Sequence, residues 1–146
     1  MRLTTRTSIA MRALMFCAMH RGEVVRKADI AVACNASLHH MAQVIHLLGR
    51  HGLLLTARGR GGGVMLGHAP RDISVGQVVR RLESDLPFIE CADTRTNTCP
   101  LIEGCRLRGG FARALDAFYA ALDEISLHDL VQGNGALART LELEPA

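Results

Sequence analysis

Three of the five cysteines, Cys91, Cys99 and Cys105, fall within one short segment of the 146-residue chain. Their spacing is wider than the two to four residues between paired ligands of a structural zinc site. Iron–sulfur clusters prefer thiolate ligands, and a proline after a ligating cysteine, as in Cys99-Pro100, occurs in ferredoxin-type ligand runs. The segment therefore predicts a loop whose three thiolates hold an iron–sulfur centre.

Two other interpretations of these cysteines stay open. Cysteine is often buried, so the three side chains could be unconnected parts of a core. Alternatively, two of them could form a disulfide on oxidation, as in a thiol switch without a cluster. The odd number of cysteines disfavours a framework of structural disulfides. Cys17 and Cys34 lie on apolar helical faces and are expected to be small core side chains.

The composition is that of an ordinary globular domain, with 49% hydrophobic and 21% charged residues. Only 3% of the residues are aromatic, which disfavours a surface for stacking single-stranded nucleic acid. No apolar run approaches the ~20 residues of a membrane span, and the first residues lack the apolar stretch of a signal peptide. We therefore expect a cytoplasmic protein without a membrane partner.

The charge is divided unevenly along the chain. Residues 1–81 contain 12 Lys and Arg against 3 Asp and Glu, whereas residues 82–146 contain 5 against 11. A basic first half is typical of a protein that binds a polyanion such as DNA.

The basic half has the element order of a winged helix-turn-helix. Apolar periodicity predicts helices over residues 7–20, 26–34 and 38–50, the last capped by Ser37, with a tight turn at Asn35-Ala36. Short apolar runs at 53–56 and 64–66 flank a glycine-rich tip that contains Arg58 and Arg60, which predicts a hairpin. We therefore expect a mainly α-helical fold with a small β-hairpin wing.

This arrangement suits duplex DNA, because the major groove admits one helix whose N-terminal residues reach the base edges. A polar helix face alone indicates only exposure to solvent, but the turn, the wing and the basic charge together favour DNA binding. Wing arginines would contact phosphates or the minor groove, and residues near the N-terminus would contact further phosphates. The candidate DNA-binding residues are Arg2, Thr4, Ser37, His39, His40, Gln43, Arg58 and Arg60.

The acidic half is expected to follow a different plan. Ser74 should cap a helix over residues 74–82, and an irregular stretch with the three cysteines follows to about residue 108. The longest helix is predicted over residues 111–125 and a short one, capped by Ser126, over 127–131, with a fraying tail after Gly133. We divide the chain into a DNA-binding domain (1–81), a cysteine cluster loop (82–110) and a long helix with a C-terminal tail (111–146).

Several of these segments resemble the Rrf-type winged-helix transcriptional regulators over nearly the whole chain. The similarity lies in Met1-Arg2-Leu3-Thr4, in Ala10-Met11-Arg12-Ala13-Leu14, in the glycine-rich wing, in Ile73-Ser74-Val75-Gly76 and in Asp129-Leu130-Val131. The resemblance implies that Cys91, Cys99 and Cys105 hold the cluster and that helix 111–125 forms a homodimer. It further implies that the dimer binds a near-palindromic double-stranded operator.

The branches of this family differ in their signal and in their ligands. NsrR-like members, which sense nitric oxide, hold a 4Fe–4S cluster whose fourth ligand can be an Asp at the position of Ser8; serine is a poor iron ligand. The candidates for the fourth ligand position here are Ser8, Glu90, Asp93, Glu103, a water or a small thiol, and the position could also lack a ligand. IscR-like members use a His after the third cysteine, which this chain lacks, whereas RirA-like iron sensors share the three-cysteine loop.

The resemblance therefore favours a repressor that senses nitric oxide through a 4Fe–4S cluster, with a 2Fe–2S cluster as the other form. An iron-responsive or redox-responsive regulator is the alternative. An enzyme is disfavoured, because the seven histidines show no Glu-flanked metal helix and no Cys/His/Asn set.

Overall fold

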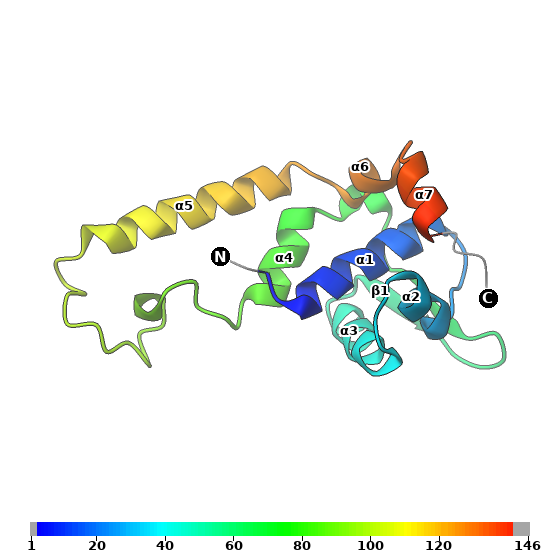
Figure 1. The fold of residues 1–146 in the computed structure, drawn as a ribbon, viewed down its shortest axis with the longest axis horizontal. Coiled ribbons are helices and arrows are strands. Elements are labelled where there is room, and N and C mark those ends of the chain that lie inside the picture. The colour runs from blue at the N-terminus through cyan, green and yellow to red at the C-terminus, as the bar shows by residue number, and fades with distance from the viewer. Residues whose placement is uncertain (1–2, 142–146) are drawn as a thin grey trace.

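A computed structural model describes residues 3–141, which form a mainly helical fold with one antiparallel hairpin, as predicted (Figure 1). Two short 3₁₀ turns, η1 and η2, complete it. In chain order the elements are α1 (Thr5–Met19), α2 (Lys27–Ala33), α3 (Leu38–Arg50), β1 (Leu54–Ala57), β2 (Gly63–Leu66), η1 (Pro70–Asp72), α4 (Val75–Glu83), η2 (Glu90–Ala92), α5 (Arg106–Asp123), α6 (Leu127–Val131) and α7 (Gly135–Leu141).

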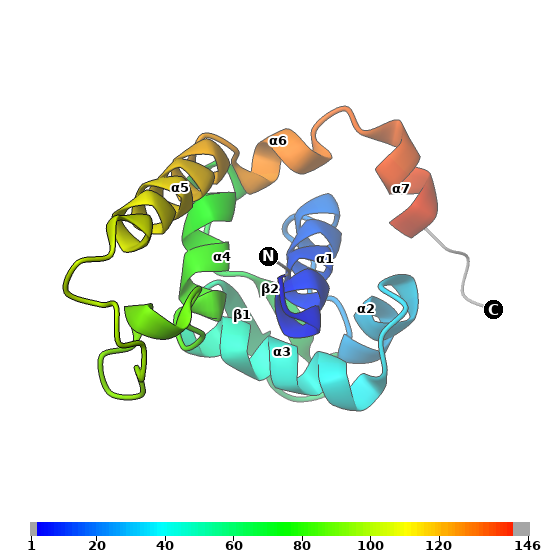
Figure 2. The same ribbon diagram turned by 60° about the vertical axis from the view of Figure 1, so that its left-hand side comes forward.

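Helix α1 lies at the centre of the core and contacts α2, α3, α4 and α6 (Figure 2). Its inward face carries Ala10, Ala13 and Leu14, all fully buried, and the small alanines let neighbouring helices approach closely. Cys17 is 2% exposed and Cys34 is 3% exposed, which confirms that both are small core side chains. The core therefore belongs mainly to the first half of the chain.

Serine caps fix three of the helix starts. The hydroxyl groups of Ser37 and Ser74 each accept a hydrogen bond from the backbone N–H three residues later. Ser126 does the same, and Asp129 Oδ2 accepts a bond from the backbone N–H of Ser126 at 2.8 Å, which completes a reciprocal capping box. These contacts confirm the starts predicted for the three helices.

The wing is joined to the core through residue Val25. Val25 and Val64 exchange two backbone hydrogen bonds of 2.9 and 2.8 Å, which form an isolated antiparallel β-bridge beside the two-stranded hairpin. Gly59 and Gly61 at the tip have φ values of +95° and +78°, a backbone conformation that side chains with a Cβ rarely adopt. At Gly63 a Cβ would collide with the carbonyl oxygen of Val25, so this close approach requires glycine.

After α4 the chain leaves the core as a loop over residues 84–105, here called the cysteine loop, and returns along α5 (Figure 1). Helix α5 packs on α4, where Arg80 forms a 2.9 Å ion pair with Asp123 and lies 4.5 Å above the ring centroid of Tyr119. No described side chain of α5 is fully buried. Its apolar face is therefore only partly covered within one chain.

The cysteine loop and α5, together here called the excursion, begin and end at neighbouring points of the fold. The backbone N–H of Val75 donates to the carbonyl of Ile125 at 2.9 Å, and the N–H of Leu127 donates to the carbonyl of Ile73 at 2.8 Å. The start of α4 and the start of α6 are consequently held side by side, although about fifty residues separate them.

Three details of the predicted elements are corrected. The spacing of apolar residues over 38–50 places Leu38 on the apolar stripe of the helix, but Leu38 is 52% exposed, because the buried side chains of α3 begin one turn later at Met41. The tail after Gly133 does not fray at once but forms α7, whose Leu141 is buried. The longest helix begins at Arg106 rather than 111, since helix geometry tolerates Gly109 and Gly110 at about 1 kcal/mol each.

Candidate DNA-binding surface and cysteine loop

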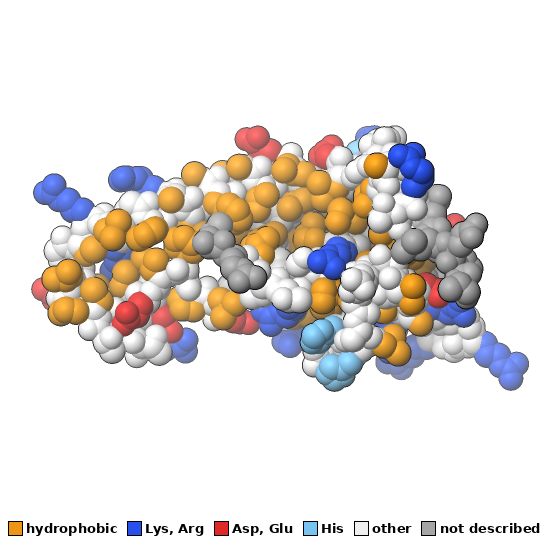
Figure 3. Space-filling view, viewed as in Figure 1, with side chains coloured by type: hydrophobic (Ala, Val, Ile, Leu, Met, Phe, Trp, Pro, Cys, Tyr) orange, Lys and Arg blue, Asp and Glu red, His pale blue; other side chains and the backbone are white. Residues whose placement is uncertain are grey.

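Helix α3 presents a polar face to solvent at the position of a recognition helix. His39, His40 and Gln43 are exposed on it, opposite the buried face that starts at Met41. Histidine side chains gather at the surface over α3 in Figure 3. The Ser37 hydroxyl accepts a bond from the backbone N–H of His40 at 3.1 Å, and an accepting hydroxyl keeps its own proton for a further partner.

The turn that aims this helix depends on Asn35. Its φ of +49° places it in the left-handed region, which Asn adopts more readily than most residues. The backbone N–H of Ala36 donates to the carbonyl of Ala31 at 2.9 Å, which closes the turn between α2 and α3. The predicted turn at these two residues is confirmed.

Arg58 and Arg60 lie at the exposed tip of the wing. Among the described residues neither guanidinium forms an ion pair, so both charges face solvent. The wing and the polar face of α3 supply positive charge and hydrogen-bond donors, the groups that contact a DNA duplex. Their contact with DNA stays a prediction.

Arg2 and Thr4, the predicted DNA contacts near the N-terminus, differ from those on α3 and the wing. Arg2 lies outside the described residues. Thr4 caps α1, and its hydroxyl donates to Glu83 Oε1 at 2.7 Å while its backbone N–H donates to the same oxygen at 3.0 Å. Thr4 therefore already has a partner at the end of α4, and its phosphate contact stays a prediction.

The contact between Thr4 and Glu83 is a feature that sequence patterns did not suggest. The two residues are 79 positions apart, and no periodicity or capping rule relates positions so distant. Although partial burial opposes the charged form, hydrogen bonds from Thr7 and Thr4 lower the pKa of Glu83 below its ordinary value. Arg6 adds a second link, because its Nη2 donates to the carbonyl of Leu82 at 2.7 Å. The start of α1 is thus joined to the last residues before the cysteine loop.

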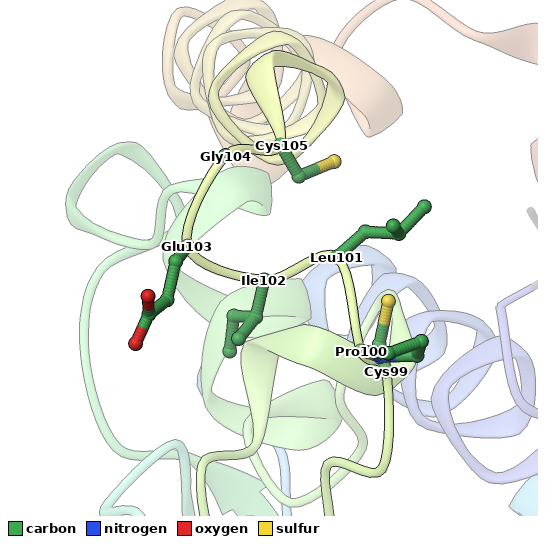
Figure 4. A pocket seen from close by; sticks show the side chains of 7 residues that line it. All are labelled: Cys99, Pro100, Leu101, Ile102, Glu103, Gly104 and Cys105. Atoms are coloured by element: carbon green, nitrogen blue, oxygen red, sulfur yellow. The ribbon is translucent and has the colours of Figure 1, made fainter.

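Two of the three loop cysteines line one cavity. Cys99 and Cys105 border an open cavity of about 590 Å³ together with Leu101 and Ile102. Figure 4 shows the two sulfur atoms on the same side of the loop, whereas the carboxylate of Glu103 points away from both. The cavity thus places two thiols on a partly apolar wall.

Cys91 lies on η2 and completes the set of loop thiols. All three are half-buried and free, whereas burial raises the pKa of Cys17 to about 12 and that of Cys34 to about 11. A raised pKa disfavours the thiolate, which is the form that binds metal, so Cys17 and Cys34 are poor candidates for metal ligands. The chemistry of the three loop cysteines fits an iron–sulfur centre.

The side chains as placed do not by themselves form a closed ligand set. Within residues 3–141 no three His, Cys, Asp or Glu side chains converge on one metal position. Ser8, one of the candidate fourth ligands, lies on α1, and its hydroxyl accepts a hydrogen bond from Arg12 Nη2 at 3.2 Å. The cysteine loop lies on the far side of α4 from α1 in both views (Figures 1 and 2). The ligand set stays a prediction.

Comparison with known proteins places this architecture among transcriptional regulators. The model of the Rrf2 family, described as "Iron-dependent Transcriptional regulator", matches residues 3–133. The transcriptional regulator NsrR of Bacillus subtilis is 39% identical over 145 residues, which cover 99% of each chain. The transcriptional repressor NsrR of Streptomyces coelicolor is 40% identical over 133 residues, covering 90% of this chain and 88% of that protein.

Solved structures agree with these sequence relatives. IscR of T. potens superposes with a TM-score of 0.72 at 26% identity, covering 100% of this chain and 93% of that one. CymR of B. subtilis, described as the global cysteine regulator of that organism, superposes with a TM-score of 0.70 at 26% identity, covering 90% of this chain and 96% of that one. The helix-turn-helix and wing therefore define a winged-helix protein.

The chain belongs to the Rrf2 family of transcriptional regulators. It is accordingly a regulator and not an enzyme, as expected. Among the described residues no helix has the length and apolar character to cross a bilayer.

Proposed function

We propose that this protein is a homodimeric, DNA-binding repressor that senses nitric oxide through an iron–sulfur cluster held by Cys91, Cys99 and Cys105. The single observation that carries the proposal is the contrast among the five cysteines. The two outside the loop are buried, while the three within it are half-exposed and two share a cavity. The NsrR relatives at 39% and 40% identity support this choice.

The cysteine loop is well placed to influence DNA binding. The loop begins directly after Glu83, whose carboxylate accepts a hydrogen bond from Thr4, the N-cap residue of α1. It ends at Cys105, the N-cap residue of α5. A 4Fe–4S cluster, or a 2Fe–2S cluster, would supply an iron with a weakly held position at which nitric oxide reacts. A change in the loop backbone then shifts α4 and α5 relative to α1.

The partly covered apolar face of α5 supports a dimer built on that helix. Two copies would place two α3 helices at half-sites of one operator, with Ser37, His39, His40 and Gln43 near the bases and Arg58 and Arg60 at the backbone. A shift of α5 changes the separation of the two helices and weakens specific binding. The proposed division is 1–81 for DNA binding, 82–110 for sensing and 111–146 for dimerisation.

Anaerobic purification followed by native mass spectrometry tests the proposal, because it counts iron, sulfide and subunits together. We expect a coloured dimer that binds operator DNA and releases it after a few equivalents of nitric oxide. Cys99→Ala should lose the colour and retain its fold, whereas Cys34→Ala, which changes a cysteine outside the loop, should retain both. Operator binding that is equally tight before and after nitric oxide would contradict the proposal.

A thiol switch without a cluster is the second candidate. It is favoured by the lack of a converged three-residue metal site among residues 3–141 and by the structural similarity to CymR. A colourless protein that loses the mass of two protons on oxidation would support it. A coloured protein that releases DNA on iron depletion but not with nitric oxide would support an iron-responsive regulator instead.

A further inference from the structure

The carboxylate of Glu90 joins the two ends of a turn within the cysteine loop. Its Oε1 atom accepts a hydrogen bond from the Thr98 hydroxyl at 2.6 Å and another from the Thr98 backbone N–H at 3.0 Å. Glu90 is the first residue of η2, and Thr98 follows eight residues later. We call this pair of bonds the Glu90–Thr98 clamp.

Each partner of the clamp directly precedes a loop cysteine. Cys91 follows Glu90 and Cys99 follows Thr98, so the clamp brings the backbones of both cysteines to one end of the turn. The Cys99 backbone is held further, because its N–H donates to Asn97 Oδ1 at 3.1 Å. Within the turn the N–H of Asn97 donates to the carbonyl of Asp93 at 3.0 Å. The first two loop thiols are therefore attached to an ordered backbone.

We propose that Glu90 is a positioning residue, which holds Cys91 and Cys99 together so that they bind one metal centre jointly. The inference rests on the proposed cluster function. Closing a flexible loop costs conformational entropy, and a clamp that closes the loop before binding removes that cost from the binding step. An acceptor that carries a charge makes a stronger hydrogen bond than a neutral one, so a carboxylate suits this task.

This role differs from that of a fourth metal ligand. The oxygen that accepts both bonds already faces Thr98, and Thr98 supplies its backbone N–H as well as its side chain. A positioning residue keeps the Cys91 and Cys99 thiols close together. Its removal must therefore change how readily these two thiols react with each other in metal-free protein. It must also leave the electronic spectrum of a bound cluster unchanged.

The first experiment uses metal-free protein with Cys105→Ser, so that Cys91 and Cys99 are the only loop thiols. In a glutathione buffer the two thiols form one disulfide while one oxidised glutathione accepts two electrons and two protons to give two reduced molecules. Peptide mass spectrometry gives the equilibrium fraction of the Cys91–Cys99 disulfide. Glu90→Ala and Thr98→Val should each lower this equilibrium constant about fivefold, the size of a surface hydrogen bond to a charged group.

Matched variants separate the clamp from a general loss of structure. Thr98→Ser retains the hydroxyl and should behave as the parent. Asp85→Ala removes an exposed carboxylate of the loop outside the turn and should have no effect. Equal disulfide constants in the parent, Glu90→Ala and Thr98→Val would overturn the proposal. A parent that forms no Cys91–Cys99 disulfide would overturn it too.

The second experiment uses the full chain with all five cysteines, reconstituted with iron and sulfide. Glu90→Ala should lose iron to a chelator about fivefold faster than the parent, with the same charge-transfer absorption bands. Shifted bands with iron retained would make Glu90 a ligand and overturn the positioning role. A parent that binds no iron would refute the cluster, while the disulfide measurement would still decide whether the clamp exists.

Discussion

Glu83 Oε1 lies 2.7 Å from the hydroxyl oxygen of Thr4, and this bond joins the end of α4 to the start of α1. The oxygen also accepts the backbone N–H of Thr4, so one carboxylate satisfies two donors at the helix cap. The residue directly after Glu83 begins the cysteine loop. Any movement at the start of that loop therefore acts on the central helix of the core through a hydrogen bond.

Glu83→Gln should make the contribution of the Thr4–Glu83 contact to the unfolding free energy independent of pH. The folded pKa of Glu83 is lowered, so its contribution to stability is present above the unfolded pKa and is lost as pH falls through the folded value. We expect the wild type to exceed the variant by about 1 kcal/mol in unfolding free energy at neutral pH. Thermal unfolding at a series of pH values should show this difference disappearing in acid. The exposed Glu23→Gln control should show no such trend, and a difference that persists in acid would contradict the prediction.

Arg58→Ala combined with Arg60→Ala should weaken DNA binding without sequence preference. Each lost phosphate contact should lower the slope of log affinity against log salt by about 1. Fluorescence anisotropy over a range of KCl concentrations measures both effects. Arg139→Ala on α7 removes an equal charge away from the wing and should leave the slope unchanged. A double variant with an unchanged slope would remove the wing from the proposed interface.

Gln43→Ala should reduce sequence discrimination rather than general affinity. A side chain that contacts a base edge contributes about 1–3 kcal/mol to the preference for the correct base, so specific binding should fall about tenfold or more while non-specific binding stays constant. Competition between operator and random DNA measures the ratio. Gln77→Ala, an exposed glutamine on α4, is the matched control. Equal losses on both DNAs would indicate that Gln43 contacts the backbone instead.

Gly63→Ala should destabilise the wing, because its Cβ would collide with the Val25 carbonyl oxygen. We expect a loss of about 1–3 kcal/mol in unfolding free energy by chemical denaturation. Gly109→Ala on α5 has no neighbour within 4 Å and should instead stabilise the helix by about 0.5–1 kcal/mol. If both substitutions raised or both lowered the unfolding free energy, the space described at one of the two glycines would be wrong.

Leu107→Glu should prevent dimer formation if the proposed interface follows the apolar face of α5. Leu107 is 64% exposed in the single chain, so the change costs little in folding and acts on association. Analytical ultracentrifugation should show monomers for this variant and dimers for Ala112→Glu, which changes an exposed alanine of the same helix. A dimer that persists in Leu107→Glu would place the interface elsewhere.

Local chemistry explains why much of the fold was predictable. Serine caps at positions 37, 74 and 126 act within one turn of their helix, so their effect is visible in a short window of sequence. The helix 135–141 was missed because its burial depends on Leu137 and Leu141 packing against a distant core. Glu83 and Glu90 were not recognised as structural partners for the same reason: their donors lie 79 and 8 residues away.

Two backbone hydrogen bonds between segments 73–75 and 125–127 hold the two ends of the excursion together. This closure allows the segment between α4 and α6 to vary while α1, α2, α3 and the wing keep their mutual contacts. Under the proposed division of the chain, evolution could therefore replace the signal-sensing segment of such a regulator while its DNA-binding part is retained. A chimera that carries a relative's segment between α4 and α6 should respond to the relative's signal and bind the DNA site of this protein.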